Sequence, residues 1–353
     1  MIRVLHIISD KNIGGAGILL LNQLTASDRK NFLYSVALPK GSMLTERIKA
    51  LGINTFEADL TLTGLLPVIK LVRPHIIHTH ACAKARIAAR LCGVKAINTR
   101  HCAPDTSEPV SLIRKAANRI FDALFTHKTI ATAHYVKTRL INESIPPHKI
   151  SVIINGSVPK QVLNSNQRKE ARKKWGFDQS HLIVGIVGRL EKGKGQEYFI
   201  EAARLCSDCD EMKFIIAGDG SMKNQLMKQA KGLANIKFAG FIEDISEIMN
   251  VIDVNVNLSY ISETSSLSLS EGMSVGAVPI VSDCGGNSFV VGDCGIVIPK
   301  RDSQALASAL KSLYSDRSRL DELAKKSRNR FFKRLTAEAM TKETEAVYKS
   351  LIE

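Results

Sequence analysis

Short apolar runs rich in β-branched residues alternate along the chain with stretches of helical periodicity. A glycine-rich turn separates the first apolar run from the first helical stretch. This alternation is typical of parallel sheets that are covered by helices. In the first half it predicts strands at 4–9, 33–38, 76–80, 96–100, 129–132 and 150–154, and helices at 18–26, 83–92 and 112–124.

The same pattern starts again after a polar, strongly basic stretch at 159–174 that leads into a helix. The restart predicts two doubly wound α/β domains, and such domains bind ligands at the carboxyl ends of their strands. No repeat of roughly 20–50 residues is visible, which argues against a solenoid. The second half is predicted to form strands at 183–187, 213–217, 236–238, 254–258 and 278–281, and helices at 196–206, 303–314, 317–330 and 338–351.

Size and composition are those of an ordinary folded protein. A length of 353 residues suits two domains, and the chain is 44% hydrophobic and 24% charged. No apolar run reaches the ~18 residues of a transmembrane helix, and the first ten residues are too short for a signal peptide. The seven cysteines are dispersed and odd in number, which favours reduced thiols in the cytoplasm. We interpret the CxxC spacing of Cys206 and Cys209 as coincidence.

A formal charge of +15 bears on the partners of the protein rather than on its fold. Residues 81–150 hold twelve Lys/Arg against four Asp/Glu, and 316–334 hold eight against three. Because no zinc-finger, RNP or helix-turn-helix signature accompanies this charge, we expect no nucleic-acid partner. An anionic membrane surface or a phosphorylated lipid acceptor fits the charge, and a merely solvated surface is the alternative.

The helix predicted at 112–124 combines cations with a large apolar face. Such a helix lies on an anionic bilayer, or it covers a sheet inside the domain. Its cations are Arg114, Lys115 and Arg119, and its apolar residues include Ile113, Ile120, Phe121 and Leu124.

The loop after the first strand, 12–17, holds Gly14, Gly15 and Gly17. Glycines at such a place let backbone N–H groups approach a phosphate, although a tight turn without a ligand has the same composition. The loop lacks the G-x-G-x-x-G spacing, and no carboxylate ends the second strand. NAD binding is therefore excluded.

A second loop, 188–195, places Arg189 and Lys194 between a strand and a helix N-terminus. Two cations beside a helix N-terminus neutralise a diphosphate, and solvated loop charges are the alternative. The loop does not have the form of a nucleoside-triphosphatase phosphate loop.

Glu263 and Glu271 are eight residues apart. We expect a helix to start near Glu263 and to contain Glu271, which places both carboxylates near one helix face, about 12 Å apart along it, although on spacing alone a solvated helix is the alternative. That separation is too long for a shared catalytic dyad and suits two contacts with one long ligand.

The order of these motifs resembles family 4 of the retaining glycosyltransferases, which have the GT-B fold. The resemblance covers nearly the whole chain. It rests on Gly188-Arg189-Leu190 with Lys194-Gly195, on Ile216-Ala217-Gly218-Asp219-Gly220, on Phe238-Ala239-Gly240-Phe241, on the E-x7-E pair Glu263/Glu271, on 276–281, and on Gly285-Gly286, with Asn155-Gly156 before the linker.

The resemblance implies a role for individual residues. Arg189 and Lys194 would bind the donor diphosphate, Glu263 the transferred sugar and Glu271 the ribose. His101 matches the family histidine near the donor sugar, so the catalytic roles fall on Arg189, Lys194, Glu263 and His101. The other residues assigned to donor binding are Gly14, Gly15, Gly188, Gly218, Asp219, Gly220, Phe241, Leu267 and Ser268.

The resemblance also implies a division of labour along the chain. Residues 1–158 would form a Rossmann-like acceptor-side domain and 159–335 the nucleotide-sugar-binding domain, with a helix in 336–353 packing back on the first. The expected activity is transfer of a hexose from a nucleotide-sugar, with a UDP-sugar favoured, to a hydroxyl of a saccharide or glycolipid. Retention of the anomer, no metal and no cofactor are expected. A GT-B sugar-nucleotide epimerase and a non-catalytic basic binding protein are the alternatives.

We expect this activity to serve lipopolysaccharide or polysaccharide synthesis in the cytoplasm, with peripheral binding to the inner face of the plasma membrane as one option. Three positions depart from the family pattern and bear on the identity of the donor sugar. Phe289 replaces a frequent glutamate, Gly272 an alanine, and 264–266 the usual glycines.

Two further motifs contain residue types that commonly bind metal ions. His78-Thr79-His80 has no third ligand evident from the sequence. We expect these residues to face the acceptor at a strand end, and the alternative is that they are hydrogen-bonded in the core. Asp208-Cys209-Asp210 matches the DxD of metal-dependent sugar transferases, but it lies between a helix and a strand and is predicted to be a surface loop. Neither motif predicts a metal site.

Overall fold

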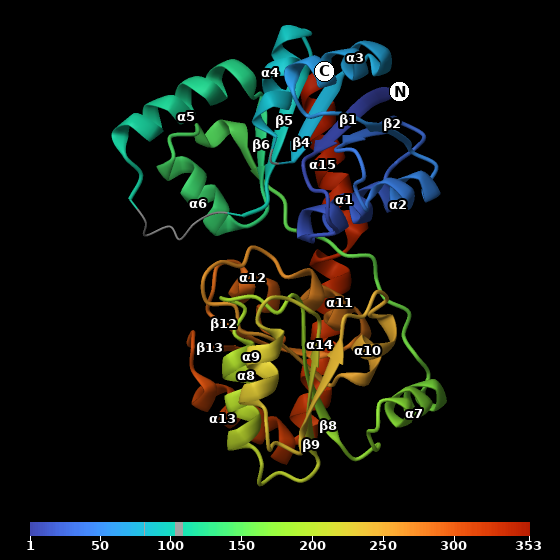
Figure 1. The fold of residues 1–353 in the computed structure, drawn as a ribbon, viewed down its shortest axis with the longest axis vertical. Coiled ribbons are helices and arrows are strands. Elements are labelled where there is room, and N and C mark those ends of the chain that lie inside the picture. Colours follow the sequence, from blue (N-terminus) through green and yellow to red (C-terminus); the bar gives the residue numbers. More distant parts are fainter. Residues whose placement is uncertain (81, 103–108) are drawn as a thin grey trace. The chain divides into compact units, whose positions relative to one another are not determined.

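The computed structural model describes residues 1–80, 82–102 and 109–353. The chain divides into two compact units (Figure 1). The N-terminal unit comprises Met1–Val158 together with Thr336–Glu353, and the C-terminal unit comprises Pro159–Leu335. Each unit is built on one parallel sheet with helices on it, so the predicted doubly wound α/β class is confirmed.

The sheet of the N-terminal unit has the strand order β3-β2-β1-β4-β5-β6-β7. Its strands are β1 (Ile2–Ile8), β2 (Phe32–Leu38), β3 (Asn54–Glu57), β4 (Ile76–His80), β5 (Lys95–Arg100), β6 (Lys128–Ala131) and β7 (Ile150–Val152). Its helices are α1 (Gly15–Thr25), α2 (Thr45–Ala50), α3 (Leu62–Val72), α4 (Ala83–Leu91), α5 (Leu112–Phe125), α6 (His134–Asn142), the 3-10 turn Pro147–Lys149 and α15 (Ala337–Ile352).

The two faces of this sheet differ in chemistry because alternate residues of a strand point to opposite faces. On one face Leu5, Ile7 and Ile77 pack with α3 and α4 in an apolar core. The other face carries His6 of β1 and His78 of β4, which lie side by side in register. The last helix, α15, contacts α1 and closes this second face, as its red ribbon beside β1 and β4 shows in Figure 1.

The sheet of the C-terminal unit has the strand order β10-β9-β8-β11-β12-β13. Its strands are β8 (Leu182–Val187), β9 (Met212–Ala217), β10 (Ile236–Gly240), β11 (Val254–Asn257), β12 (Val278–Ser282) and β13 (Ile296–Ile298). Its helices are α7 (Ser165–Lys174), α8 (Gln196–Leu205), α9 (Lys223–Gln229), α10 (Ser246–Val251), α11 (Leu267–Val275), α12 (Asn287–Val291), α13 (Ser303–Ser315) and α14 (Arg317–Arg334).

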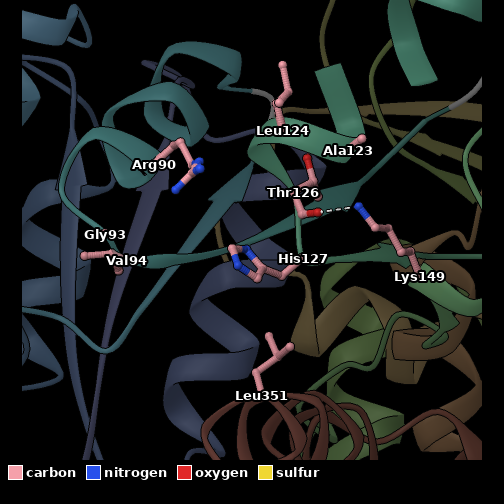
Figure 2. A pocket seen from close by; sticks show the side chains of 9 residues that line it. All are labelled: Arg90, Gly93, Val94, Ala123, Leu124, Thr126, His127, Lys149 and Leu351. Atoms are coloured by element: carbon pink, nitrogen blue, oxygen red, sulfur yellow. Dashed lines mark hydrogen bonds between the residues drawn. The ribbon is translucent and has the colours of Figure 1, made fainter. Parts of the chain in front are cut away.

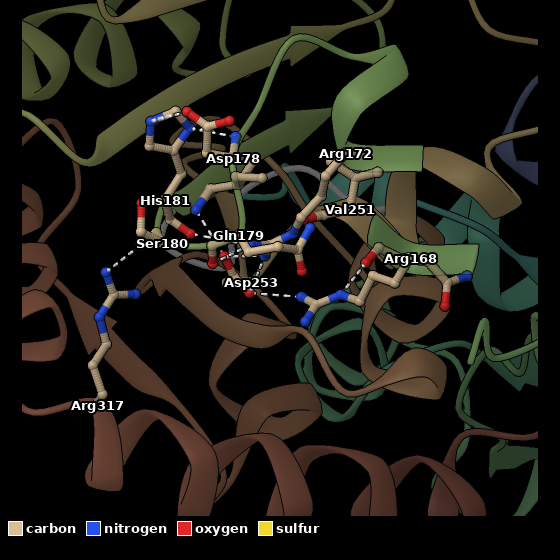
Figure 3. A network of polar contacts seen from close by, with 11 residues as sticks. Arg168, Arg172, Asp178, Gln179, Ser180, His181, Val251, Asp253 and Arg317 are labelled. Atoms are coloured by element: carbon tan, nitrogen blue, oxygen red, sulfur yellow. Dashed lines mark hydrogen bonds and ion pairs between the residues drawn. The ribbon is translucent and has the colours of Figure 1, made fainter. Parts of the chain in front are cut away.

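The basic stretch that leads into this unit is tied to the sheet by ion pairs (Figure 3). Arg168 and Arg172 of α7 both donate to Oδ1 of Asp253, at 2.6 and 2.7 Å, and Asp253 Oδ2 accepts from the backbone N–H of Ile183. Arg172 is buried and also donates to backbone carbonyls. Because removal of one partner from a buried ion pair costs about 3–5 kcal/mol, Asp253 fixes α7 against the starts of β8 and β11.

Several short elements are absent from the sequence prediction, among them α2, β3, α3, α6, α9, α10, α12 and β13. In α3, Gly64 and Pro67 both lower the intrinsic helix propensity. Leu65 and Ile69 are nonetheless buried against the sheet, so packing outweighs local preference there. Within the described residues, no helix is both long enough and apolar enough to span a bilayer.

Candidate active site

The loop predicted to bind phosphate lies at the carboxyl end of β8 and leads into α8. Gly195 is the N-cap of α8 and has a left-handed φ of 81°. A Cβ at this position would collide with the backbone and side chain of Leu258, so glycine is the residue that fits. Because glycine has no side chain to cap the helix, the N–H groups of Gln196 and Glu197 at the start of α8 remain available to an anion, whereas that of Tyr198 donates to the carbonyl of Gly195.

The two predicted cations of this loop differ in their surroundings. The side chain of Arg189 is exposed and makes no ion pair within the described residues, while its backbone carbonyl accepts a hydrogen bond from Gln196. Lys194 is half-buried, and its Nζ forms an ion pair of 2.9 Å with Glu263. Of the two predicted cations, one is therefore without an ion pair within the described residues and the other is held by a carboxylate, and both lie beside a helix N-terminus.

Glu263 lies in the loop after β11, and three donors converge on its Oε2. They are Lys194 Nζ and Ser259 Oγ at 2.9 Å and Asn257 Nδ2 at 3.2 Å. The prediction that a helix starts near Glu263 is wrong, because α11 begins at Leu267 with Ser266 as its N-cap. The serines and threonine at 264–266 favour capping and turn conformations, so the chain enters the helix later.

Glu271 lies inside α11, and its side chain has different partners from that of Glu263. Its carboxylate pairs with Lys160 at 3.1 Å. Burial raises the pKa of Glu271, and the Lys160 charge opposes that shift. The predicted donor residues Leu267 and Ser268 form the first turn of α11, where Asn255 donates to the carbonyl of Ser268.

Asn255 also explains one departure from the family pattern. A Cβ at Gly272 would lie 2.5 Å from Asn255 Nδ2, so the amide of Asn255 occupies the space of the alanine side chain that is usual there.

The loop after β9 joins the phosphate loop through the backbone. Leu190 N donates to the carbonyl of Asp219 at 2.9 Å, and a Cβ at Gly218 would collide with the carbonyl of Gly188. The side chain of Asp219 pairs with Lys223 at 2.7 Å, and this hydrogen bond lowers the pKa of Asp219. Gly220 continues the same loop.

Phe241 follows β10 at the same edge of the sheet, and its side chain is 74% exposed. An exposed aromatic ring at a strand end offers a stacking surface for a planar base. The predicted donor residues of the C-terminal unit therefore all come from loops or helix starts beyond the carboxyl ends of β8 to β11, except Glu271, which lies deeper in α11.

The N-terminal unit carries the other predicted residues. Gly14 is the N-cap of α1 and makes no side-chain cap, and Gly15 is the exposed first residue of this helix. His101 follows β5 directly and is partly exposed. All three lie beyond the carboxyl ends of strands of the N-terminal sheet.

His101 is the end of a row of histidines that the sequence did not reveal. His6, His78 and His80 are buried, and a ring nitrogen of each lies within 4.8 Å of the others. The expectation that His78 and His80 face the acceptor is therefore wrong. His6 was not predicted, because only the pairing of β1 with β4 brings it beside His78.

Asp208 is exposed and pairs with Lys311, in the connection between α8 and β9, so the predicted surface loop is confirmed. All seven cysteines are free thiols, as expected for reduced cysteines.

A pocket of about 400 Å³ lies away from these residues, at the amino ends of β5 and β6 (Figure 2). Lys149 points into it, but its Nζ donates to the carbonyls of Asp122 and Thr126 and pairs with the Asp122 carboxylate. Arg90 makes no ion pair within the described ranges and supplies an unpaired cation. The exposed Leu124 of α5 lines the same pocket.

Solved structures of other proteins share the complete fold of this chain. HepE of Anabaena in complex with UDP and glucose has a TM-score of 0.84 at 20% identity, over 99% of this chain and all of HepE. A glycosyltransferase from Rickettsia africae has a TM-score of 0.87 at 17% identity, over 100% of this chain and 99% of its own. The two parallel-sheet units thus have the GT-B fold of glycosyltransferases.

Sequence comparison gives the family. Residues 14–159 match the model described as glycosyltransferase family 4, and residues 181–316 match the model described as glycosyl transferases group 1. A relative from Escherichia coli, UDP-Gal:alpha-D-GlcNAc-diphosphoundecaprenol alpha-1,3-galactosyltransferase, is 29% identical over 85% of this chain and 83% of its own length. The chain belongs to family 4 of the glycosyltransferases.

Proposed function

We propose that this glycosyltransferase moves a hexose from a UDP-sugar to a hydroxyl of a saccharide or glycolipid acceptor, with retention and without a divalent metal. One observation carries the proposal: Arg189, Lys194 and the uncapped N-terminus of α8 gather positive charge in one loop at the carboxyl edge of the C-terminal sheet. A diphosphate carries the complementary charge. The Escherichia coli relative, named for UDP-Gal, and the UDP complex of HepE support the choice of base.

In the proposed reaction the bond between the anomeric carbon and the diphosphate oxygen breaks while the bond to the acceptor oxygen forms on the same face of the sugar. The acceptor proton passes to the departing phosphate oxygen, so the products are a glycoside and a nucleoside diphosphate. Arg189, Lys194 and the N–H groups of α8 stabilise the negative charge that grows on the diphosphate. These positive groups take the place that a divalent cation occupies in metal-dependent transferases.

Each predicted donor residue has a proposed contact. Glu263 accepts hydrogen bonds from the transferred sugar, Glu271 from the ribose, and Phe241 stacks on the base. The loops at Gly14–Gly15, Gly188 and Gly218–Gly220 approach the donor with backbone N–H groups, aided by Leu267 and Ser268. His101 contacts the donor sugar.

The test compares Lys194→Ala with Lys192→Ala in assays of sugar transfer, after a thermal-shift screen of UDP-, GDP- and ADP-hexoses has identified the donor. Lys192 is an exposed cation of the same loop and serves as the matched control. Lys194→Ala should lower kcat/KM by about two orders of magnitude, because an unmatched charge on the leaving group costs about 2–4 kcal/mol. Lys192→Ala should retain near-normal turnover.

Three outcomes would refute parts of this proposal. Equal turnover of the two variants would remove the role of Lys194. Loss of transfer in EDTA with recovery in Mn²⁺ would remove metal independence. NMR of the donor alone that shows conversion of its sugar would favour an epimerase.

We also propose that α5 lies on an anionic membrane surface and brings the enzyme to a lipid-linked acceptor. The specific observation is the exposure of its apolar side chains, which reaches 85% for Ile113 and 61% for Ile120. Among its residues only Asp122 is buried, so the helix does not use this apolar face to cover the sheet. Arg114, Lys115 and Arg119 on the helix supply the attraction to anionic headgroups.

A further inference from the structure

Three histidines of the N-terminal unit are joined end to end by hydrogen bonds. His6 Nδ1 lies 3.0 Å from His80 Nε2, and His80 Nδ1 lies 2.8 Å from His101 Nε2. The ring planes are inclined by only 20° and 25°, and the centroids are 5.3 and 5.1 Å apart. Each centroid–centroid separation is longer than the corresponding nitrogen–nitrogen distance by about the width of one imidazole ring. The two rings of each pair therefore meet edge to edge through their bonding nitrogens.

This arrangement does not suit a metal ion, although His6, His78 and His80 are close enough to suggest one. A zinc site needs lone pairs that converge on one point at about 2.0–2.1 Å. The ring nitrogens of His78 bond to Tyr348 Oη and Thr99 Oγ1, both at 2.6 Å. Of the six ring nitrogens of His6, His78 and His80, five are thus engaged in hydrogen bonds, and only Nε2 of His6 has no partner among the described residues.

The rings of His6, His80 and His101 are uncharged near neutral pH. Burial lowers the pKa of His6 to about 3 and that of His101 to about 4, and it lowers the pKa of His80 well below the usual value. A neutral imidazole carries one N–H and one lone pair. Three neutral rings in a row therefore have two ordered arrangements, with all protons directed toward His101 or all directed toward His6.

His6, at the buried end of this row of histidines, decides between the two arrangements. His6 Nε2 is buried and has no hydrogen-bond partner among the described residues. If it carried a proton, that N–H would be an orphaned buried donor, which folded proteins avoid more strictly than an under-used acceptor. The lone pair therefore lies on His6 Nε2. His6 Nδ1–H then donates to His80, and His80 Nδ1–H donates to His101 Nε2.

We propose that His6 and His80 are positioning residues that lock His101 in the tautomer with its proton on Nδ1. His101 then presents an N–H donor, and no lone pair, at its outward nitrogen, which has no hydrogen-bond partner within the described residues. It would recognise an oxygen acceptor such as a hydroxyl of the donor hexose, and it would not act as a general base. The contact with the sugar rests on the proposed function, whereas the tautomer does not.

The lock is tested directly on the whole protein labelled with ¹⁵N-histidine, by long-range ¹H–¹⁵N correlation NMR near pH 7. The signals of His101 are identified by their loss in His101→Gln. We expect a protonated Nδ1 and a bare Nε2 for His101, although a free histidine side chain prefers the opposite tautomer. A protonated Nε2 would overturn the lock whether or not the protein transfers sugar. Histidine signals that change on EDTA treatment would overturn it in favour of a metal site.

A variant series adds a functional readout. His80→Phe keeps a ring in place and removes the N–H that donates to His101 Nε2. The ¹⁵N signal of His101 Nε2 should therefore shift, because its lone pair loses its hydrogen bond, and kcat/KM for the donor should fall about three- to tenfold, because the His101 ring is no longer held. The exposed His148 provides the control, since His148→Gln should change neither the His101 signals nor the kinetics. Far-UV circular dichroism verifies folding. His101 unchanged in a folded His80→Phe would overturn the lock.

Addition of the donor to the wild-type protein separates the lock from the proposed function. If His101 shows the expected tautomer and the NMR signal of its Nδ1–H shifts when the donor is added, both the tautomer lock and the contact with the sugar are supported. If it shows the tautomer but does not respond to a donor that binds, the lock stands and the contact of His101 with the sugar is refuted.

Discussion

At the scale of single residues, Lys194 and Glu263 form an ion pair of 2.9 Å although both are proposed to contact the donor. A diphosphate and the Glu263 carboxylate would therefore compete for the same ammonium group. Glu263→Gln keeps the side-chain shape and removes the competing charge. We expect UDP to bind this variant about two- to fivefold more tightly, since a partly exposed ion pair contributes about 0.5–1 kcal/mol, while sugar transfer falls.

Isothermal titration with UDP measures the first effect, and a transfer assay measures the second. Glu247→Gln, which breaks an exposed ion pair with Lys174, is the control and should leave UDP affinity unchanged. Weaker binding of UDP to Glu263→Gln would mean that Glu263 holds Lys194 in its binding position instead of competing for it.

At the scale of elements, α5 is a helix whose apolar face is exposed, with Ser111 as its N-cap. Burial of one isoleucine is worth about 1.5–3 kcal/mol, so removal of two from a membrane surface should weaken binding tenfold or more. We expect Ile113→Asp/Ile120→Asp to lose flotation with anionic liposomes, and the wild-type protein to lose it at high salt. Leu71→Asp, at an exposed leucine of α3, is the matched control and should still float. Failure of the wild-type protein to float at low salt would remove the membrane proposal.

At the scale of the whole molecule, the two units should respond differently to acid. Burial lowers the pKa of His6 to about 3, that of His101 to about 4, and those of His78 and His80 well below 6.5. Between about pH 6.5 and 4 the unfolded chain therefore binds more protons than the folded N-terminal unit. The free energy of unfolding of the N-terminal unit is therefore highest above pH 6.5. It falls on acidification by up to about 1.4 kcal/mol per histidine and pH unit.

The tyrosines that face these histidines do not change this prediction. Burial raises the pKa of Tyr34 and Tyr348, so both phenols stay protonated throughout this pH range. The single tryptophan, Trp175, belongs to the C-terminal unit and reports on it by fluorescence. We expect far-UV circular dichroism to lose signal at a higher pH than the Trp175 fluorescence changes. Coincident transitions would contradict this expectation, and His148→Gln should leave both in place.

Much of the fold followed from the sequence because each long element carries its own pattern. The strands predicted at 76–80, 183–187 and 278–281 agree with β4, β8 and β12 to within one residue. Elements such as β3, with four partly exposed residues, carry too short a pattern to be recognised. The start of α11 was misplaced because local capping at 264–266 outweighs the helical pattern that follows.

The sequence by itself determined the class of the chain, the loop that gathers Arg189 and Lys194, and the place of the predicted donor residues other than Glu271 beyond the ends of strands. These features are local in the chain, so residue order contains them. Only the tertiary structure decided that Lys194 meets Glu263, that Lys160 meets Glu271, and that His6 joins His80 and His101. Such contacts join residues 21 to 111 positions apart, and the order of strands in a parallel sheet, which brings them together, is not encoded in any single segment.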